Sequence, residues 1–152
     1  MNAIQPVDIA LLKKYDKAGP RYTSYPTAPY FSESLDDQAY IRHIEKDLKS
    51  MENKDLSLYF HIPFCDTLCY FCGCTMMVTR SQDKIEAYLD YLEKEILLLR
   101  KHIGDGRKVR QLHWGGGTPT HLSPTQISRL GAAIHASFDF HEDAEVSVEI
   151  DP

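Results

Sequence analysis

Residues 56–74 read LSLYFHIPFCDTLCYFCGC, an apolar run that passes directly into four cysteines. The run LSLYFHI at 56–62 is short, apolar and aromatic and is closed by Pro63, which is typical of a buried strand. The cysteines therefore follow the C-terminal end of this strand. All the cysteines of the chain lie here, namely Cys65, Cys69, Cys72 and Cys74.

The segments that follow this strand predict an α/β fold. Apolar residues recur every three or four positions over 82–101, which predicts an amphipathic helix. A strand-like VRQLHW at 109–114 comes next, then a helical pattern over 123–137 and a strand-like AEVSVEI at 144–150. This alternation predicts parallel strands joined by right-handed crossovers, with the active site at their C-terminal ends. Because three parallel strands leave an open edge, we expect the first part of a longer (β/α) barrel.

The residues before residue 56 predict an N-terminal helical arm. A short helical pattern over 9–15 leads into GPRYTSYPTAPYF at 19–31, whose prolines exclude a regular helix or a central strand. Helical spacing returns over 34–51. We therefore divide the chain into an arm with its helix at 1–55 and the first β/α units at 56–152.

Composition and charge narrow the classes of function. The chain has 152 residues, of which 43% are hydrophobic and 26% charged, as in ordinary globular domains. A net charge of −5 excludes the strongly basic surface that binds nucleic acid or anionic membranes. No stretch approaches the roughly 18 apolar residues of a membrane span, and Asp8 stands where a signal peptide needs basic residues. We expect a cytoplasmic protein with no nucleic-acid or membrane partner.

The spacing of the cysteines indicates a metal centre. A disulfide framework spreads its cysteines along the chain, whereas pairs this close would close only tiny loops. A structural zinc site is the main alternative, but it usually takes two CxxC-like pairs from separated segments. Thiolates hold iron–sulfur clusters, and a four-iron cluster with only three protein ligands keeps one iron open to an exogenous ligand.

The spacing of Cys65, Cys69 and Cys72, with Phe71 before the third cysteine, resembles the CxxxCxxC signature of the radical S-adenosylmethionine (SAM) superfamily. The resemblance implies a [4Fe-4S] cluster on these three cysteines, with SAM chelating the fourth iron. It implies cleavage of SAM to methionine and a 5′-deoxyadenosyl radical that abstracts a hydrogen atom. GGGTP at 115–119 is similar to the superfamily's glycine-rich segment, where glycine lets the backbone approach a ligand closely. The implied fold is the first part of a radical-SAM partial barrel, preceded by the helical arm.

Five segments are similar to a particular family, the oxygen-independent coproporphyrinogen III oxidases. They are PRYTSYPTA (20–28), LYFHIPFC (58–65), CYFCGC (69–74), LHWGGGTPT (112–120) and VEIDP (148–152). This resemblance implies oxidative decarboxylation of coproporphyrinogen III to protoporphyrinogen IX in haem biosynthesis. We expect the porphyrinogen as substrate, an electron donor for the cluster and a monomeric protein.

The same resemblance implies the residues of the site. Three residues look like ligands of the SAM molecule at the cluster: Tyr59, Gly116 and Glu149. Three look like contacts to a second SAM molecule: Phe71, Gly117 and Thr118. Cys74 resembles a fourth family cysteine that is not a cluster ligand. Without the resemblance, Tyr59 suggests a core tyrosine and Glu149 an ordinary strand carboxylate, and structural roles are favoured for His61 and His113.

Two other functions stay open at the level of sequence. One is a related haem chaperone that keeps the cluster and cofactor signatures but delivers haem. The arm at 20–28 and Cys74 oppose it, because the resemblance implies that such relatives lack this arm and carry phenylalanine at the position of Cys74. The other is a radical SAM enzyme with another substrate, which the same first half of a barrel would accommodate.

Overall fold

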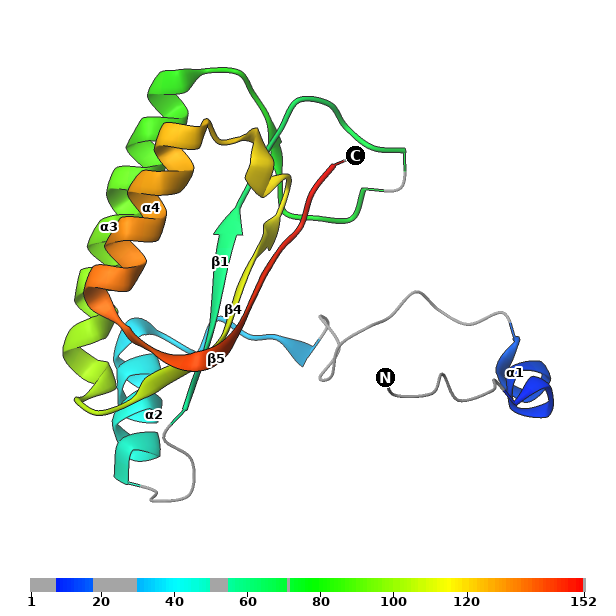
Figure 1. Ribbon diagram of the computed structural model, residues 1–152. Coiled ribbons are helices and arrows are strands. Elements are labelled where there is room, and N and C mark those ends of the chain that lie inside the picture. The colour runs from blue at the N-terminus through cyan, green and yellow to red at the C-terminus, as the bar shows by residue number, and fades with distance from the viewer. Residues whose placement is uncertain (1–7, 18–29, 50–54, 71, 152) are drawn as a thin grey trace. The chain divides into compact units, whose positions relative to one another are not determined.

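The computed structural model describes residues 8–17, 30–49, 55–70 and 72–151 (Figure 1). The chain divides into two units after Asp36. In the first unit, helix α1 (Ile9–Tyr15) begins after Asp8, whose carboxylate accepts hydrogen bonds from two backbone amides of the first turn. This helix matches the predicted helical pattern, whereas most of the predicted proline-rich arm lies outside the described residues.

A parallel sheet forms the centre of the second unit. Its strands are β1 (Leu56–Ile62), β4 (Lys108–Gly116) and β5 (Asp139–Val148), in the order β1-β4-β5 (Figure 1). The predicted parallel strands are therefore confirmed. β5 begins before the predicted residue 144 because its first residues already pair with β4, ahead of an irregularity in the register. The polar HED at 141–143 interrupts the apolar alternation, so the sequence pattern does not reveal this early start.

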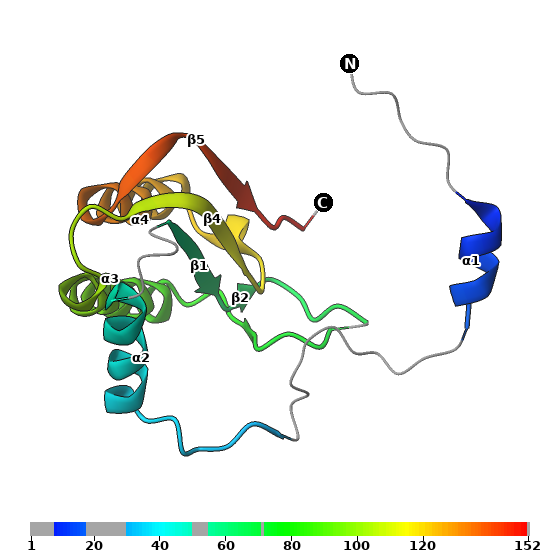
Figure 2. The ribbon, with the colours of Figure 1, turned by 90° about the horizontal axis from the view of Figure 1, so that it is seen from below.

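Two helices cover one face of the sheet (Figures 1 and 2). α3 (Gln82–Ile103) follows β1 and α4 (Pro124–Ser137) follows β4, which confirms the predicted alternation of strand and helix. Ser123 begins α4 with a capping box, which satisfies backbone amides at the helix start. Among the described residues, no helix is both long and apolar enough to cross a membrane.

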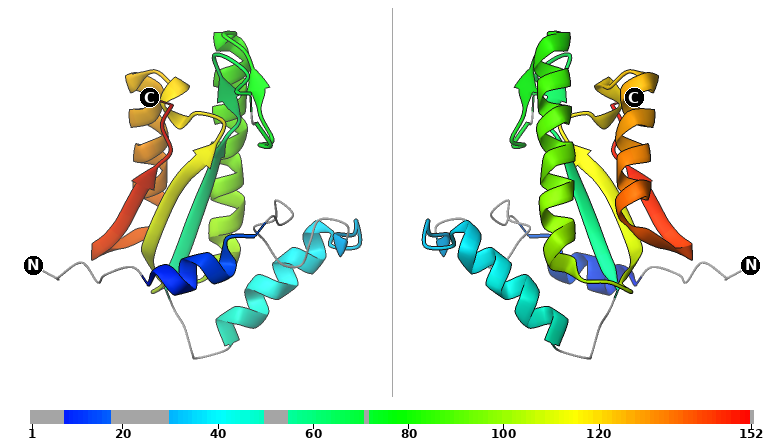
Figure 3. Two further views of the ribbon diagram at one scale, coloured as in Figure 1. Left: turned by 90° about the vertical axis from the view of Figure 1, so that its right-hand side faces the viewer. Right: turned by 90° about the vertical axis from the view of Figure 1, so that its left-hand side faces the viewer.

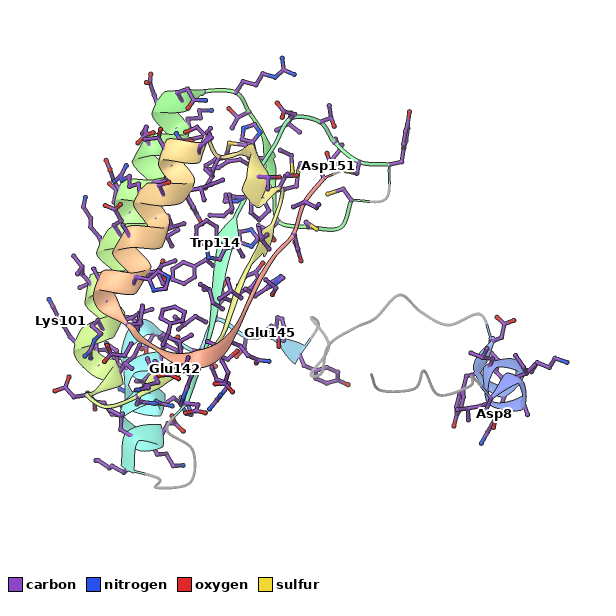
Figure 4. The ribbon with its side chains drawn as sticks, in the orientation of Figure 1. Asp8, Lys101, Trp114, Glu142, Glu145 and Asp151 are labelled. Carbon is purple, nitrogen blue, oxygen red and sulfur yellow. The ribbon has the colours of Figure 1, made fainter. Side chains whose placement is uncertain are left out.

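The hydrophobic core lies between this sheet face and the two helices. Trp114 of β4 belongs to it and is 8% exposed (Figure 4). The fully buried aliphatic members are Ile62, Ile85, Leu89, Val109, Leu130 and Ile134. Burying one such side chain contributes about 1.5–3 kcal/mol, so this layer holds the sheet and the helices together.

The opposite face of the sheet carries polar side chains. Figure 3 shows the strands in front of α3 and α4 from one side and behind them from the other. Along β1 the burial alternates, so that Phe60 is 7% exposed toward the helices while Tyr59 is 58% exposed on the other face. The strand register aligns Tyr59 with His113 and His113 with Ser147 across this open face.

Helix α2 (Asp37–Lys49) belongs to the unit that contains the sheet. Its Ile44 packs against the core, and its Asp47 forms an ion pair of 2.9 Å with Arg107. The division that we drew from the sequence at residue 55 instead groups this helix with the arm. The sequence pattern shows the apolar stripe of the helix but not the surface on which the stripe packs.

A second, very short parallel pair lies beyond β1. β2 (Phe64–Cys65) pairs with β3 (Met77–Val78), and the Met77 amide donates to the Pro63 carbonyl oxygen at 2.6 Å. Two-residue strands carry no readable periodicity, so the sequence did not predict them. The pair closes the base of the segment that contains Cys69, Cys72 and Cys74.

A matched pair of substitutions tests how much the hydrophobic core stabilises the fold. Leu130 of α4 is fully buried, whereas Leu98 of α3 is 58% exposed. Leu130→Ala leaves a cavity and is expected to lower the free energy of unfolding by about 2–5 kcal/mol. Leu98→Ala is expected to change it by less than about 0.5 kcal/mol. Urea titration followed by circular dichroism measures both, and equal losses would contradict this core.

Candidate functional site

The candidate site lies where the three parallel strands end. β1 leads through β2 into residues 65–76, termed the cysteine loop, and β4 ends within residues 115–118, termed the glycine segment. β5 is followed by Glu149. Figures 1 and 3 show these ends at the same edge of the sheet, and Figure 4 places Asp151 there as well. In open parallel sheets, ligands bind outside this edge.

The glycine segment packs directly against the start of the cysteine loop. The Gly117 amide donates to the Ile62 carbonyl oxygen at 2.8 Å, and the Thr118 amide donates at 2.8 Å to the carbonyl of Phe64. A Cβ atom at Gly117 would lie 2.7 Å from the Phe64 carbonyl oxygen and 2.8 Å from Cys65 Sγ. Only glycine permits this approach without a shift of the backbone. The Thr118 hydroxyl donates to Cys65 Sγ at 3.6 Å.

The other two glycines make room for side chains of the neighbouring strands. A Cβ atom at Gly116 would lie 2.6 Å from the His61 ring, and the φ of 118° at Gly116 disfavours any other residue. A Cβ atom at Gly115 would lie 3.0 Å from both the Tyr59 ring and the Glu149 carboxylate. The glycine run therefore lets side chains of β1 and the side chain of Glu149, just after β5, come together over the end of β4.

A polar network crosses the open face from the cysteine loop to β4. His61 Nε2 lies 2.7 Å from the Thr75 carbonyl oxygen, to which it donates. In the neutral ring Nδ1 is then an acceptor, and the Tyr59 hydroxyl donates to it at 3.0 Å. The Tyr59 ring also stacks on His113, with centroids 5.8 Å apart and planes 20° apart. These contacts fix the side chain of Tyr59 although it is more than half exposed.

Glu149 closes the network on the β5 side. Its Oε2 accepts the Gly116 amide at 3.1 Å, and its Oε1 lies 3.3 Å from His113 Nε2. The Glu149 amide donates to the Trp114 carbonyl oxygen at 2.9 Å, which extends the pairing of β4 with β5. Burial raises the pKa of Tyr59, and the charge of Glu149 raises it further. Tyr59 is therefore a neutral phenol that can donate a hydrogen bond.

Asp66 ties the cysteine loop to the segment beyond the glycines. Its carboxylate accepts from Arg80 Nε at 3.1 Å and lies 3.3 Å from Nδ1 of His121, in the short helix η2 (Pro119–His121). Burial opposes ionisation, but the hydrogen bonds from His121 and Arg80 hold the pKa of Asp66 below its usual value. Asp66 is therefore charged at neutral pH and anchors the loop at its first residue after Cys65.

The four cysteines differ in their surroundings. Cys65 is 7% exposed, while Cys69 and Cys72 are exposed. The Cys72 amide donates to the Cys69 carbonyl oxygen at 3.1 Å. Burial raises the pKa of Cys74, and the nearby Cys72 raises it further, which opposes the thiolate that binds metals. Within the described ranges no three His, Cys, Asp or Glu side chains are arranged to hold a metal ion. The ligand set of Cys65, Cys69 and Cys72 stays a prediction.

The structure brings together most of the residues that the sequence assigned to cofactor binding. Those that meet at the strand ends are Tyr59, Gly116, Gly117, Thr118 and Glu149. Phe71 lies outside the described residues. The sequence reasoning placed Gly115 in the glycine run but gave it no role of its own. It missed Asp66 with His121, which lie 55 positions apart and carry no local signal.

Known proteins resemble the chain over most of its length. Oxygen-independent coproporphyrinogen III oxidase of Escherichia coli K12 is 53% identical over 95% of this chain, which spans 31% of that relative. The protein of the same name from Mannheimia haemolytica is 50% identical over 95% of this chain and 96% of its own length. The solved structure of E. coli coproporphyrinogen III oxidase, described as a radical SAM enzyme, matches with a TM-score of 0.76 at 50% identity, over 95% of this chain and 31% of that one. No protein-family model matches the chain.

Alanine at Gly117 tests the contact between the glycine segment and the cysteine loop. Because its Cβ would lie 2.8 Å from Cys65 Sγ, the loop must move away. We expect iodoacetamide to alkylate Cys65 several-fold faster in Gly117→Ala, measured by peptide mass spectrometry, while the circular dichroism spectrum stays unchanged. Gly73→Ala, in the same loop, is the matched control because a Cβ there meets no atom within 4 Å. Equal alkylation rates in the two variants would refute the contact.

Proposed function

The chain belongs to the family of oxygen-independent coproporphyrinogen III oxidases, and on this premise we propose that its protein converts coproporphyrinogen III to protoporphyrinogen IX in haem biosynthesis. The observation that carries the proposal is the junction of Gly117 with Cys65, beside the Glu149 carboxylate. It supports binding of one ligand by the ends of all three strands. The chain spans 31% of the length of the E. coli relative, and the activity is proposed for the whole protein.

The cofactors that we assign are a [4Fe-4S] cluster and SAM. The donor set fits the cluster chemically, because Cys65, Cys69 and Cys72 are free thiols on one loop and thiolates are the usual ligands of iron–sulfur clusters. The glycine segment is suited to bind a ligand beside that cluster, because Gly117 has no side chain and its backbone can lie close to Cys65. In this assignment Cys74 is not a ligand.

The residues that we assign to SAM take distinct roles. Glu149 has carboxylate lone pairs beyond those occupied by Gly116 and His113, and these can accept from an ammonium or hydroxyl group. Gly116 contributes its backbone, and the neutral phenol of Tyr59 borders the same space. To a second SAM molecule we assign three contacts, namely Phe71, Gly117 and Thr118.

When bound, the cofactors would supply a 5′-deoxyadenosyl radical able to abstract a hydrogen atom from each of two propionates of the substrate. For each propionate, loss of carbon dioxide and transfer of one electron to an acceptor would leave a vinyl group. The side chains of this chain hold the reactants and keep them oriented. We further propose an electron donor as a partner, a monomeric protein and a cytoplasmic location, where a reducing environment keeps closely spaced cysteines free.

Anaerobic reconstitution of the chain with iron and sulfide tests the cluster assignment. Electron paramagnetic resonance of the reduced sample, recorded with and without SAM, is expected to give a four-iron signal that changes with SAM. Substituting Cys65, Cys69 or Cys72 by alanine is expected to abolish that signal. Cys74→Ala is the matched control and is expected to keep both the signal and its response.

Three results would count against the assignment. Tight zinc binding without cluster formation would establish the structural metal site instead. Loss of the signal in Cys74→Ala would make Cys74 a ligand. If the signal of the cluster does not change with SAM, either in this chain or in the whole protein, the cluster would serve electron transfer instead.

A further inference from the structure

His113 occupies the centre of the polar network on the open face of the sheet. Its Nδ1 lies 2.8 Å from the Ser147 hydroxyl, its Nε2 lies 3.3 Å from Glu149 Oε1, and its ring stacks against Tyr59. The histidine thus contacts one residue of β1 and two residues on the β5 side. None of the sequence motifs assigns it a part in cofactor binding.

We propose that His113 is a positioning residue that orients the Glu149 carboxylate for the ligand bound by the glycine segment. The inference rests on the proposed function, in which that ligand is SAM. His113 acts through Glu149 and does not itself need to touch the ligand.

The carboxylate of Glu149 fixes which nitrogen of the histidine ring carries the proton. An ionised carboxylate can only accept, so Nε2 is protonated and donates to Glu149 Oε1. In the neutral ring Nδ1 is then an acceptor, to which the Ser147 hydroxyl can donate. Tyr59 stacks on the ring and limits its rotation, so the donor stays directed at the carboxylate.

Glu149 depends on such support because of its place in the chain. It follows the last residue of β5, and its side chain is 53% exposed. The Gly116 amide binds only one of its oxygens, so this bond alone would leave the carboxylate free to rotate about it. With His113 on the other oxygen the carboxylate plane is fixed, and its remaining lone pairs have defined directions.

Substituting His113 by glutamine or by asparagine distinguishes the positioning role from a role in packing alone, because the two amide side chains differ in length. Glutamine at position 113 reaches the place of Nε2 and can still donate to Glu149, whereas asparagine reaches only the place of Nδ1, next to Ser147. Leucine keeps the volume and removes both bonds. Gln111→Leu is the matched control. Gln111 lies on the same strand and face, and within the described part of the chain its side chain hydrogen-bonds only Ser57, at 3.3 Å.

The first measurement needs no cofactor. Hydrogen exchange of the Gly116 amide, followed by nuclear magnetic resonance, reports how firmly Glu149 holds that amide. We expect several-fold faster exchange in His113→Asn and His113→Leu, and exchange close to that of the unmodified chain in His113→Gln and Gln111→Leu. Similar exchange in the glutamine and asparagine variants would overturn the positioning role.

The second measurement is the affinity of the reconstituted intact protein for SAM, from titration of the cluster's paramagnetic resonance signal. We expect affinity roughly tenfold weaker in His113→Asn and nearly restored in His113→Gln, with equal cluster content in both. Equal affinities throughout would overturn the role of His113 and leave the proposed function standing. An unmodified protein that does not respond to SAM would overturn the proposed function, while the exchange result would still decide whether His113 positions Glu149.

Discussion

The site depends on one steric constraint, the approach of the glycine segment to the backbone and sulfur of residues 63–65. At Gly117 no Cβ atom fits, because the Phe64 carbonyl oxygen and Cys65 Sγ would lie within 2.8 Å of it. The constraint joins two crossover units of the sheet at their C-terminal ends. This contact fixes the position at which the cysteine loop begins and places the end of β4 next to it.

The polar network depends on this arrangement. Gly115 leaves the gap through which Tyr59 and Glu149 approach each other, and Gly116 leaves room for the His61 ring. The core between the sheet and α3 and α4 keeps the strands in register, so that side chains from β1, β4 and β5 meet on the open face. The site therefore requires both the space left by the glycines and the helix packing that keeps the strands in register.

Much of this arrangement could be predicted from the sequence. Short apolar runs located the main strands and helical periodicity located the helices, while CxxxCxxC with GGGTP indicated which strand ends carry the chemistry. Contacts between distant residues could not be predicted in this way: His113 meets Glu149 36 positions away, and only the strand register reveals the pair. The early start of β5 and the short β2–β3 pair were also not predicted, because neither shows a regular pattern of apolar residues.

Anaerobic turnover would show whether the protein uses this site to oxidise a porphyrinogen, as we propose. The reconstituted protein would receive coproporphyrinogen III, SAM and a low-potential reductant, and the products would be separated by chromatography and mass spectrometry. We expect loss of carbon dioxide, a vinyl-bearing product and 5′-deoxyadenosine, all dependent on SAM. Stable capture of haem with no vinyl product would contradict it and would favour a haem-carrying role for the same fold.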